Sequence, residues 1–386
     1  AEARRLLGLA TAQGHATAQA DLADMHADGK GGPVDLAETR RLRGLAAAQG
    51  HSQAQVELGH MHLNGTGGPK DFAEARRLLG LAAMQDHAAA QANLGLMHVH
   101  GHGGPRDFTK ARRLLALAAE QGQVDAQVTL GGMLFIGTGG PKDFEEARRL
   151  YGLAAAQGDA DTQTMLGNMY LHGDGGPQDF AEARRLLGLA AGQGRCDAQT
   201  MLASMHGNGT GGPVDFAEAR RLYTLAVAQK HADAQADLGR MNLHSHGGPA
   251  DYAEARRLLG LAAAQDHADA QSNLGQMHLN GQGGPKDFAE ARRLLLLAVK
   301  QGQADAQVTL GGMYFNGTGG PTNVKEARRL LGLAAAQNHA GVRAVLDDLD
   351  RTSEARRAKE LAAADAMMAK LLAEDLEEKM VKGAAK

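Results

Sequence analysis

The stretch PKDFAEARRLLGLAAMQDHAAAQANLGLMHVHGHGG, residues 69–104, decides the fold of this chain because it contains the start and stop signals of two helices. Asp71 is the expected N-cap of the first helix, and Glu74, three residues later, completes the pattern of a capping box. Apolar residues follow at helical spacing, at Phe72, Ala75, Leu78, Leu79 and Ala82. The stretch therefore predicts an amphipathic first helix.

The second helix of this stretch is predicted to begin near His87 and to end at Gly101, before Pro105. The pattern then returns every 36 residues. All nine prolines of the chain keep this interval, at positions 33, 69, 105, 141, 177, 213, 249, 285 and 321. Helix pairs of this kind cannot bury their apolar stripes alone, so we expect them to stack in tandem.

Glycine also recurs inside the second helix, where it costs about 1 kcal/mol relative to alanine. We expect these glycines to mark places where packed helices approach each other closely. They are Gly59, Gly95, Gly131, Gly167, Gly239, Gly275 and Gly311.

The composition excludes several classes of protein. The 386 residues carry a net charge of −3, which is not the strongly basic balance of a typical nucleic-acid-binding protein. No apolar stretch reaches the ~20 residues that a membrane-spanning helix needs, so we expect a soluble protein. A single cysteine, Cys196, slightly favours a reducing compartment, cytoplasmic or organellar. The chain begins in the middle of a repeat, so we expect the first repeat to be truncated at its N-terminus.

The run A-E-A-R-R-L-L-G-L-A-A-x-Q-G-H-A-x-A-Q-x-x-L-G-x-M-H/Y, with a glycine-rich loop before the next Asp, resembles the Sel1-like repeat, a relative of the tetratricopeptide repeat. The resemblance covers residues 1 to about 346. It implies an all-α protein, a right-handed α/α superhelical solenoid. The arginine pairs of the first helices indicate about ten 36-residue helix-turn-helix repeats, and a long C-terminal helix is expected after them. The resemblance further implies an adaptor that holds other proteins together, with no catalysis and no cofactor.

We divide the chain into a repeat solenoid, residues 1–350, and a C-terminal helix, residues 351–386. A long helix is predicted from Ser353 to about Lys382. Its apolar stripe includes Leu372 and Leu376, which makes it either a capping helix on the last repeat or a helix that binds a partner.

Arginine pairs on the first helices are the most prominent polar feature. Their first members are expected to stand in a row that could contact a partner's acidic surface or a phosphate backbone. The alternative is internal pairing, since Glu74 precedes Arg77 by three residues. The candidate row consists of Arg76, Arg112, Arg148, Arg184, Arg220, Arg256 and Arg292.

Other candidate partner contacts are variable, exposed positions of the second helices. They are Glu57, His60, Asn93, Leu96, Arg240 and Gln276. The histidines His98, His100 and His102 are a weak candidate metal site, because their spacing fits no standard zinc pattern. The slot of His98 holds tyrosine in other repeats, which indicates packing or hydrogen bonding. Glutamines that recur in nearly every repeat, such as Gln85 and Gln91, are expected to tie helix ends to neighbouring backbone.

The sequence thus predicts a non-enzymatic scaffold, adaptor or linker subunit in a larger assembly of proteins. The alternative is a protein that binds RNA or another polyanion through the arginine row. A metal-dependent hydrolase at the histidine cluster is a third, weaker hypothesis.

Overall fold

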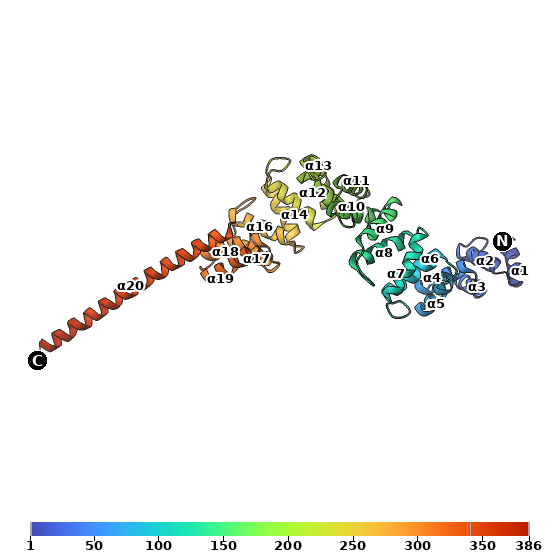
Figure 1. Ribbon diagram of the computed structural model, residues 1–386, viewed down its shortest axis with the longest axis horizontal. Coiled ribbons are helices and arrows are strands. Elements are labelled where there is room, and N and C mark those ends of the chain that lie inside the picture. The colour runs from blue at the N-terminus through green and yellow to red at the C-terminus, as the bar shows by residue number, and fades with distance from the viewer. Residues whose placement is uncertain (1, 338, 340, 385–386) are drawn as a thin grey trace. The chain divides into compact units, whose positions relative to one another are not determined.

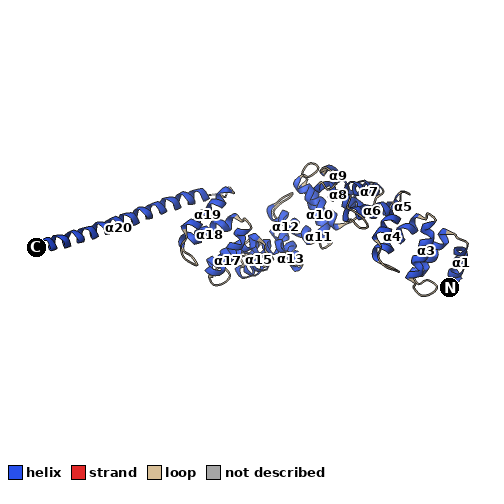
Figure 2. Ribbon diagram, turned by 90° about the horizontal axis from the view of Figure 1, so that it is seen from below, coloured by secondary structure: helices blue, strands red, loops and turns tan. Residues whose placement is uncertain are grey.

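Helices account for all the regular structure in the part of the chain that the structure describes (Figures 1 and 2). The computed structural model describes residues 2–337, 339 and 341–384, and for residues 352–357, 360 and 371–384 it describes the backbone alone. The helices are α1 (Glu2–Ala12), α2 (Ala16–Ala27), α3 (Leu36–Ala48), α4 (Ser52–Asn64), α5 (Phe72–Ala83), α6 (Ala88–His100), α7 (Phe108–Glu120), α8 (Val124–Ile136), α9 (Phe144–Ala156), α10 (Ala160–His172), α11 (Phe180–Gly192), α12 (Cys196–Asn208), α13 (Phe216–Ala228), α14 (Ala232–Leu243), α15 (Tyr252–Ala263), α16 (Ala268–Asn280), α17 (Phe288–Lys300), α18 (Ala304–Asn316), α19 (Val324–Ala336) and α20 (Val342–Ala384).

Two compact units share these helices. One contains residues 1–205 and 209–213, and the other contains residues 206–208 and 214–386. In both units the odd-numbered helices α1 to α19 are the first helices of the 36-residue pattern. Within the first unit, α6 packs on α5 and, more extensively, on α7 across the glycine-rich loop. Sequential neighbours thus make most of the contacts, as expected for stacked helix pairs.

The predicted helix starts are confirmed, but the capping box is only half formed. The Asp71 carboxylate accepts a hydrogen bond from the backbone N–H of Glu74 at 2.9 Å. The Glu74 side chain does not return to the N-cap, because it forms two hydrogen bonds with Arg77. The backbone N–H of Asp71 donates instead to the carbonyl of His62, at 2.9 Å, in the preceding helix.

The core consists of successive clusters of buried residues, mainly alanine, leucine and methionine. One cluster joins α4, α5 and α6 through Val56, Leu79, Leu94 and Met97, with alanines between them. The expectation that Phe72 belongs to the apolar stripe was wrong. Its side chain is 39% exposed, and its ring stacks on His102 with centroids 5.1 Å apart.

The glycines inside the second helices lie where neighbouring helices approach closely, as predicted. A Cβ atom on Gly95 of α6 would lie 2.8 Å from Cγ of Leu115 on α7. Gly59 has the same relation to Leu79, at 3.0 Å. The cost of glycine in these helices is therefore offset by the contact with a buried leucine of the next first helix.

The recurring glutamines link successive repeats through buried hydrogen bonds. Gln85, after the end of α5, donates to the side-chain oxygen of Gln55 in α4 at 2.9 Å. Gln55 in turn donates to the backbone carbonyl of Ala47, near the end of the first helix of its own pair, at 3.1 Å. The prediction that these side chains tie helix ends to neighbouring backbone is confirmed, since the same pair of bonds recurs at Gln121, Gln91 and Ala83.

The C-terminal helix begins earlier than the sequence analysis expected. The second helix of the last repeat and the tail form one continuous helix, α20, rather than two helices separated near Ser353. The cause lies in residues 353–357, which read SEARR where the other repeats carry the glycines and proline that end a helix. The start of α20 packs on the last repeat through the buried side chains of Val342 and Leu349.

Candidate protein-binding surface

The first arginine of each pair braces the loop that follows its own helix pair. The guanidinium of Arg76 donates to the carbonyl of Pro105 at 3.3 Å and lies 2.5 Å from Nδ1 of His98. A Cβ atom on Gly104 would lie 2.3 Å from this guanidinium, so a side chain there would displace the arginine. The other members of the predicted row make related contacts: Arg112 with Pro141, Arg148 with Pro177, Arg184 with Met205, Arg220 with Asn242, Arg256 with His278 and Arg292 with Gly319.

The residue at the slot of His98 changes while its arginine partner stays. The guanidinium carbon of Arg148 lies 3.7 Å from the ring centroid of Tyr170, a cation–π contact. Asn242 accepts a hydrogen bond from Arg220 at 2.6 Å. These contacts confirm the prediction of a packing and hydrogen-bonding slot. Direct contact between the arginine row and a partner stays a prediction.

The second arginine of the pair is held by the glutamate three residues earlier. In α5, Arg77 and Glu74 form an ion pair at 2.6 Å, and this hydrogen bonding is the main cause that lowers the pKa of Glu74 and raises the pKa of Arg77. The internal pairing expected from the sequence is therefore observed. The same ion pair occurs in every described first helix except α7.

The three candidate metal-binding histidines have separate surroundings. His98 is buried against Arg76, and burial followed by the nearby cations Arg76 and Lys110 lowers its pKa. The ring of His102 stacks on Phe72, and His100 lies 5.6 Å from His102 between ring centroids. Within the described residues, these three side chains do not bring ligand atoms together around one point.

Most of the predicted second-helix contacts are half-buried and already bonded. Glu57 pairs with Arg43 at 2.8 Å, Asn93 donates to the carbonyl of Ala89 and Gln276 donates to Thr309. His60 and Leu96 are half-buried, whereas Arg240 is exposed and bonded to Asp237. Their role in binding a partner stays a prediction.

A face of the first helices that the sequence analysis overlooked combines exposed leucine with unpacked glycine. All ten first helices carry leucine at the position of Leu81, outside the core stripe. Leu117 is 40% exposed and Leu189 is 47% exposed. The preceding residue is glycine in seven of the ten helices, and a Cβ atom on Gly44 or Gly80 would meet nothing within 4 Å. Unlike Gly95, these glycines have no packing reason within the fold.

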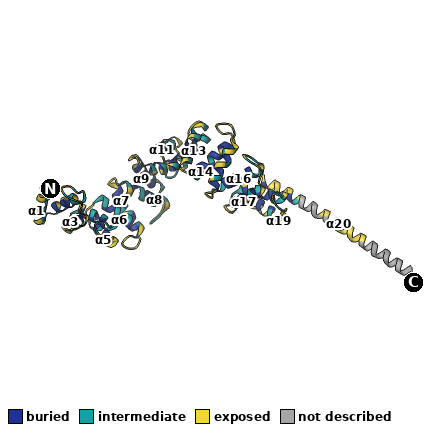
Figure 3. Cartoon of the chain, turned by 180° about the vertical axis from the view of Figure 1, so that it is seen from behind, coloured by how far each residue is buried: buried dark blue, intermediate teal, exposed yellow. Residues whose placement is uncertain are grey.

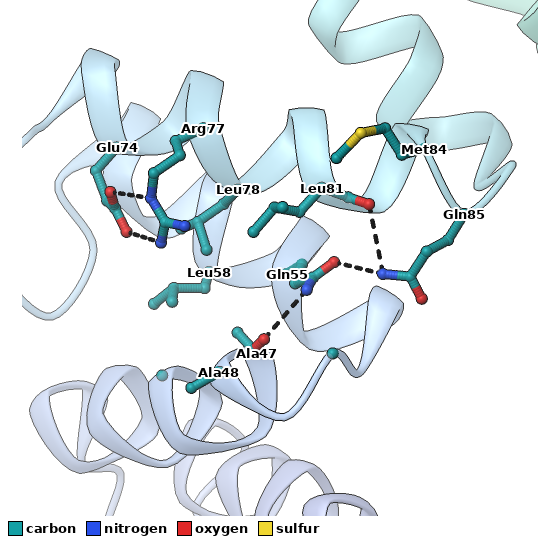
Figure 4. A pocket seen from close by; sticks show the side chains of 12 residues that line it. Ala47, Ala48, Gln55, Leu58, Glu74, Arg77, Leu78, Leu81, Met84 and Gln85 are labelled. Carbon is teal, nitrogen blue, oxygen red and sulfur yellow. Dashed lines mark hydrogen bonds and ion pairs between the residues drawn. The ribbon is translucent and has the colours of Figure 1, made fainter.

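Gly44 and Leu81 border a hollow between two successive first helices (Figure 4), and Leu117 borders another hollow on α7. One hollow, of about 640 Å³, lies between α3 and α5 above α4. The Glu74–Arg77 ion pair and the Gln85–Gln55 hydrogen bond flank it in Figure 4, and the side chain of Leu81 lies between them. The sequence signal was the leucine itself, which recurs in every repeat although it is out of phase with the buried stripe.

The C-terminal helix exposes apolar side chains along its described part. Parts of α20 are coloured as exposed in Figure 3. Leu361 is 66% exposed and Met368 is 62% exposed. The side chains of Leu372 and Leu376, predicted as partner contacts, lie outside the described residues. No helix in the described part of the chain is long and apolar enough to cross a membrane.

Helix pairs linked by glutamine bonds, arginine-braced loops and closely packed glycines define a tandem helical-repeat solenoid. The Sel1 repeat matches nine times between residues 16 and 339, at 16–51, 52–87, 88–123, 124–159, 160–194, 196–231, 232–267, 268–303 and 304–339. The chain therefore belongs to the Sel1 repeat family, and its fold is the all-α superhelical solenoid predicted from the sequence. Each family repeat, such as residues 88–123, pairs a second helix with the first helix that follows it. This division agrees with the structure, because α6 packs more extensively on α7 than on α5.

Solved structures support this assignment. The chain is similar to a protective antigen of uropathogenic Escherichia coli with an SLR fold, at 27% identity over 90% of this chain and 82% of that chain, with a TM-score of 0.70. It is also similar to a Sel1 repeat protein from Oxalobacter formigenes, at 32% identity over 80% of this chain and 89% of that chain, with a TM-score of 0.61. The comparison with curated proteins gives no significant match. Sel1 repeat proteins generally mediate protein–protein interactions and are typically non-catalytic.

Proposed function

We propose that this chain is a non-enzymatic scaffold that holds segments of partner proteins in the hollows between its first helices. The leucine that recurs in all ten first helices, exposed in eight of them and half-buried at Leu81 and Leu297, carries this proposal. Apolar side chains that gather on one surface with a polar border are typical of protein-binding sites. The neighbouring glycines, such as Gly44 and Gly80, leave room for a partner's backbone to approach the helix.

A leucine that recurs at the same position of every first helix suits a linker between subunits of a larger assembly. Equivalent leucines in successive first helices allow one chain to contact several segments of one partner, or several partners, and each contact adds to the overall affinity. We propose that such partners are subunits of a larger complex and that the exposed part of α20 offers a second contact to them.

The ionisable groups of the hollow support binding rather than catalysis. Glu74 and Arg77 stabilise each other's charged forms, so the pKa of the acid falls and the pKa of the base rises. A general acid or base instead needs a pKa close to the working pH. This ion pair therefore serves as a fixed polar border for the hollow.

Replacing exposed leucines tests the proposal. The triple variant Leu45→Ser, Leu117→Ser and Leu153→Ser changes three partly exposed side chains, so the fold should be retained. Ile136→Ser is the matched control, because Ile136 is 69% exposed but lies at the end of the second helix α8. We expect the triple variant to capture partner proteins from extracts of the source organism at least tenfold less, by quantitative mass spectrometry, than the wild type or the control.

Capture of the same proteins in the same amounts by the triple variant would contradict the proposal. Recovery of RNA that falls with rising salt and with Arg76→Ala would instead favour the polyanion-binding alternative.

A second test separates binding from stability. Gly44→Ala adds a methyl group on the border of the hollow, where nothing within the fold opposes it. The variant should be more stable by about 1 kcal/mol, since alanine is the better helix former. Weaker partner binding by a more stable protein would show that Gly44 leaves room for the partner. Unchanged binding would show that the partner does not approach this helix.

A further inference from the structure

The hollow beside α7 differs in charge from its equivalent beside α5. In the hollow between α3 and α5, the polar border is the Glu74–Arg77 ion pair, and Leu78 and Leu81 line the wall. A second hollow, of about 470 Å³, is lined by the residues 36 positions later, which are Lys110, Arg113, Leu114 and Leu117, together with Asp107 and Thr109. A lysine thus stands where the other nine first helices carry glutamate.

This exchange leaves two cations where the other repeats have a neutral pair. In the nine first helices with glutamate, the second arginine is bonded to it. Arg113 has no such partner, and the side chains of Lys110 and Arg113 are both exposed in the described structure. Residues three apart on a helix are neighbours, so a single carboxylate can contact both groups. Charge-assisted hydrogen bonds of this kind are about twice as strong as neutral ones.

We infer that the hollow on α7 binds an acidic and apolar peptide segment of a partner protein, with an Asp or Glu carboxylate on Lys110 and Arg113 and an apolar side chain against Leu114 and Leu117. This inference rests on the proposed scaffold function and adds the chemistry of the partner. Charge complementarity sets the position of the segment, because neighbouring repeats lack the cation pair. The lysine therefore gives one repeat of the array a specificity that the others do not share.

A nucleic acid fits the same surface poorly. Its phosphates follow each other every few ångströms along the strand, so binding improves with every cation along the path. Here the pair on α7 is flanked along the array by α5 and α9, whose equivalent arginines, Arg77 and Arg149, are already neutralised by Glu74 and Glu146. The apolar wall formed by Leu114 and Leu117 also matches a protein side chain better than a sugar-phosphate backbone.

Lys110→Glu is the decisive variant, because it introduces the residue that the other first helices carry. The variant should fold like the wild type, with a Glu–Arg pair on α7, and its thermal midpoint should be unchanged or higher. Lys286→Glu is the matched control, since it makes the same charge change on an exposed loop lysine of the second compact unit. Glu290→Lys is the converse variant and places a second cation pair on α17.

The probe is a random 12-residue peptide library, selected on the full chain with counter-selection on Lys110→Glu, followed by fluorescence polarisation of the enriched peptides. We expect these peptides to contain Asp or Glu beside an apolar residue. They should bind Lys110→Glu at least tenfold more weakly than the wild type, and bind Lys286→Glu within twofold of the wild type. Glu290→Lys should raise the number of bound peptides from one to two per chain.

Absence of peptides that prefer the wild type to Lys110→Glu would overturn the inference, as would enriched peptides without a carboxylate. Binding of a uridine 20-mer that depends on Lys110 as strongly as the peptides do would overturn it in favour of a polyanion site. Peptides that bind both proteins alike but lose affinity on Leu117→Ser would overturn only the acidic specificity. Peptides insensitive to both Lys110→Glu and the triple leucine variant would count against the proposed function as well.

Discussion

The same substitution at two glycines of neighbouring helices should have opposite effects on stability. Gly80→Ala, on the first helix α5, adds a methyl group that meets nothing within 4 Å. Gly95→Ala, on the second helix α6, adds a methyl group 2.8 Å from Cγ and 3.0 Å from Cδ2 of Leu115. We expect Gly80→Ala to stabilise the protein and Gly95→Ala to destabilise it relative to Gly80→Ala.

The magnitude follows from two contributions. Each substitution gains about 1 kcal/mol because alanine favours the helix more than glycine does. Carbon atoms prefer separations of about 3.5–4.0 Å, so the new contacts at Gly95 are too short. Leu115 is fully buried and its Cγ is a branch point, so α6 and α7 must separate to relieve the contact. Overpacking of this kind costs about 1–3 kcal/mol. The helix contribution cancels in the difference between the two variants, which should therefore be about 1–3 kcal/mol.

Hydrogen exchange measured by mass spectrometry is the appropriate assay, because a repeat array can open locally without unfolding as a whole. Peptides that cover α5 to α7 report both variants in the same region. Far-UV circular dichroism in urea gives the global transition for comparison. Equal protection in the two variants, or lower protection in Gly80→Ala than in the wild type, would refute the packing argument.

Further predictions concern a buried histidine and a buried glutamine. Because burial lowers the pKa of folded His98, the unfolded chain alone takes up a proton as the pH falls below the ordinary histidine value of 6.5, and stability should fall from there down to the folded pKa. His98→Tyr should weaken this loss in thermal melts between pH 7.5 and 5.0, whereas an unchanged pH dependence would exclude His98 as a cause. Gln127→Ala should cost about 1–3 kcal/mol in urea unfolding, because it removes the partner of both Gln157 and the buried carbonyl of Ala119. Gln157→Ala should cost less, and equal losses would contradict this account of the glutamine links.

Local signals allowed much of the fold to be predicted from the sequence. Asp71, Gly101 and Pro105 mark helix ends through backbone chemistry that needs no tertiary contact, and the structure has the helix ends at these places. The close helix contact at Gly95 could be predicted because glycine inside a helix is unfavourable unless a contact compensates for it. The tail was harder, since the missing stop signal at residues 353–357 joins two segments that the repeat pattern separates.

The candidate surface was harder to predict from the sequence, because a polar side chain can have several possible hydrogen-bond partners and the sequence does not show which one it contacts. Arg76 could have faced solvent, but its reach to the Pro105 carbonyl is set by the path of a loop that begins 25 residues later. The Glu74 side chain could have accepted a hydrogen bond from the backbone N–H of Asp71 or from the side chain of Arg77. In the structure it bonds to Arg77. The sequence shows that Leu117 is out of phase with the buried stripe, but its 40% exposure depends on how α7 packs against its neighbours.

The polar contacts of this fold keep constant distances along the sequence. Arg76 contacts a residue 22 positions later and a carbonyl 29 positions later, and Gln85 contacts a residue 30 positions earlier. Equivalent contacts of Arg220, Arg112 and Gln121 have the same separations. A duplication or deletion of any whole number of 36-residue segments therefore preserves every contact, whereas an insertion of another length inside a repeat breaks several at once. Unequal recombination between such repeats can thus lengthen or shorten the gene in whole-repeat steps without damaging the fold, so the number of repeats can evolve separately from the stability of each one.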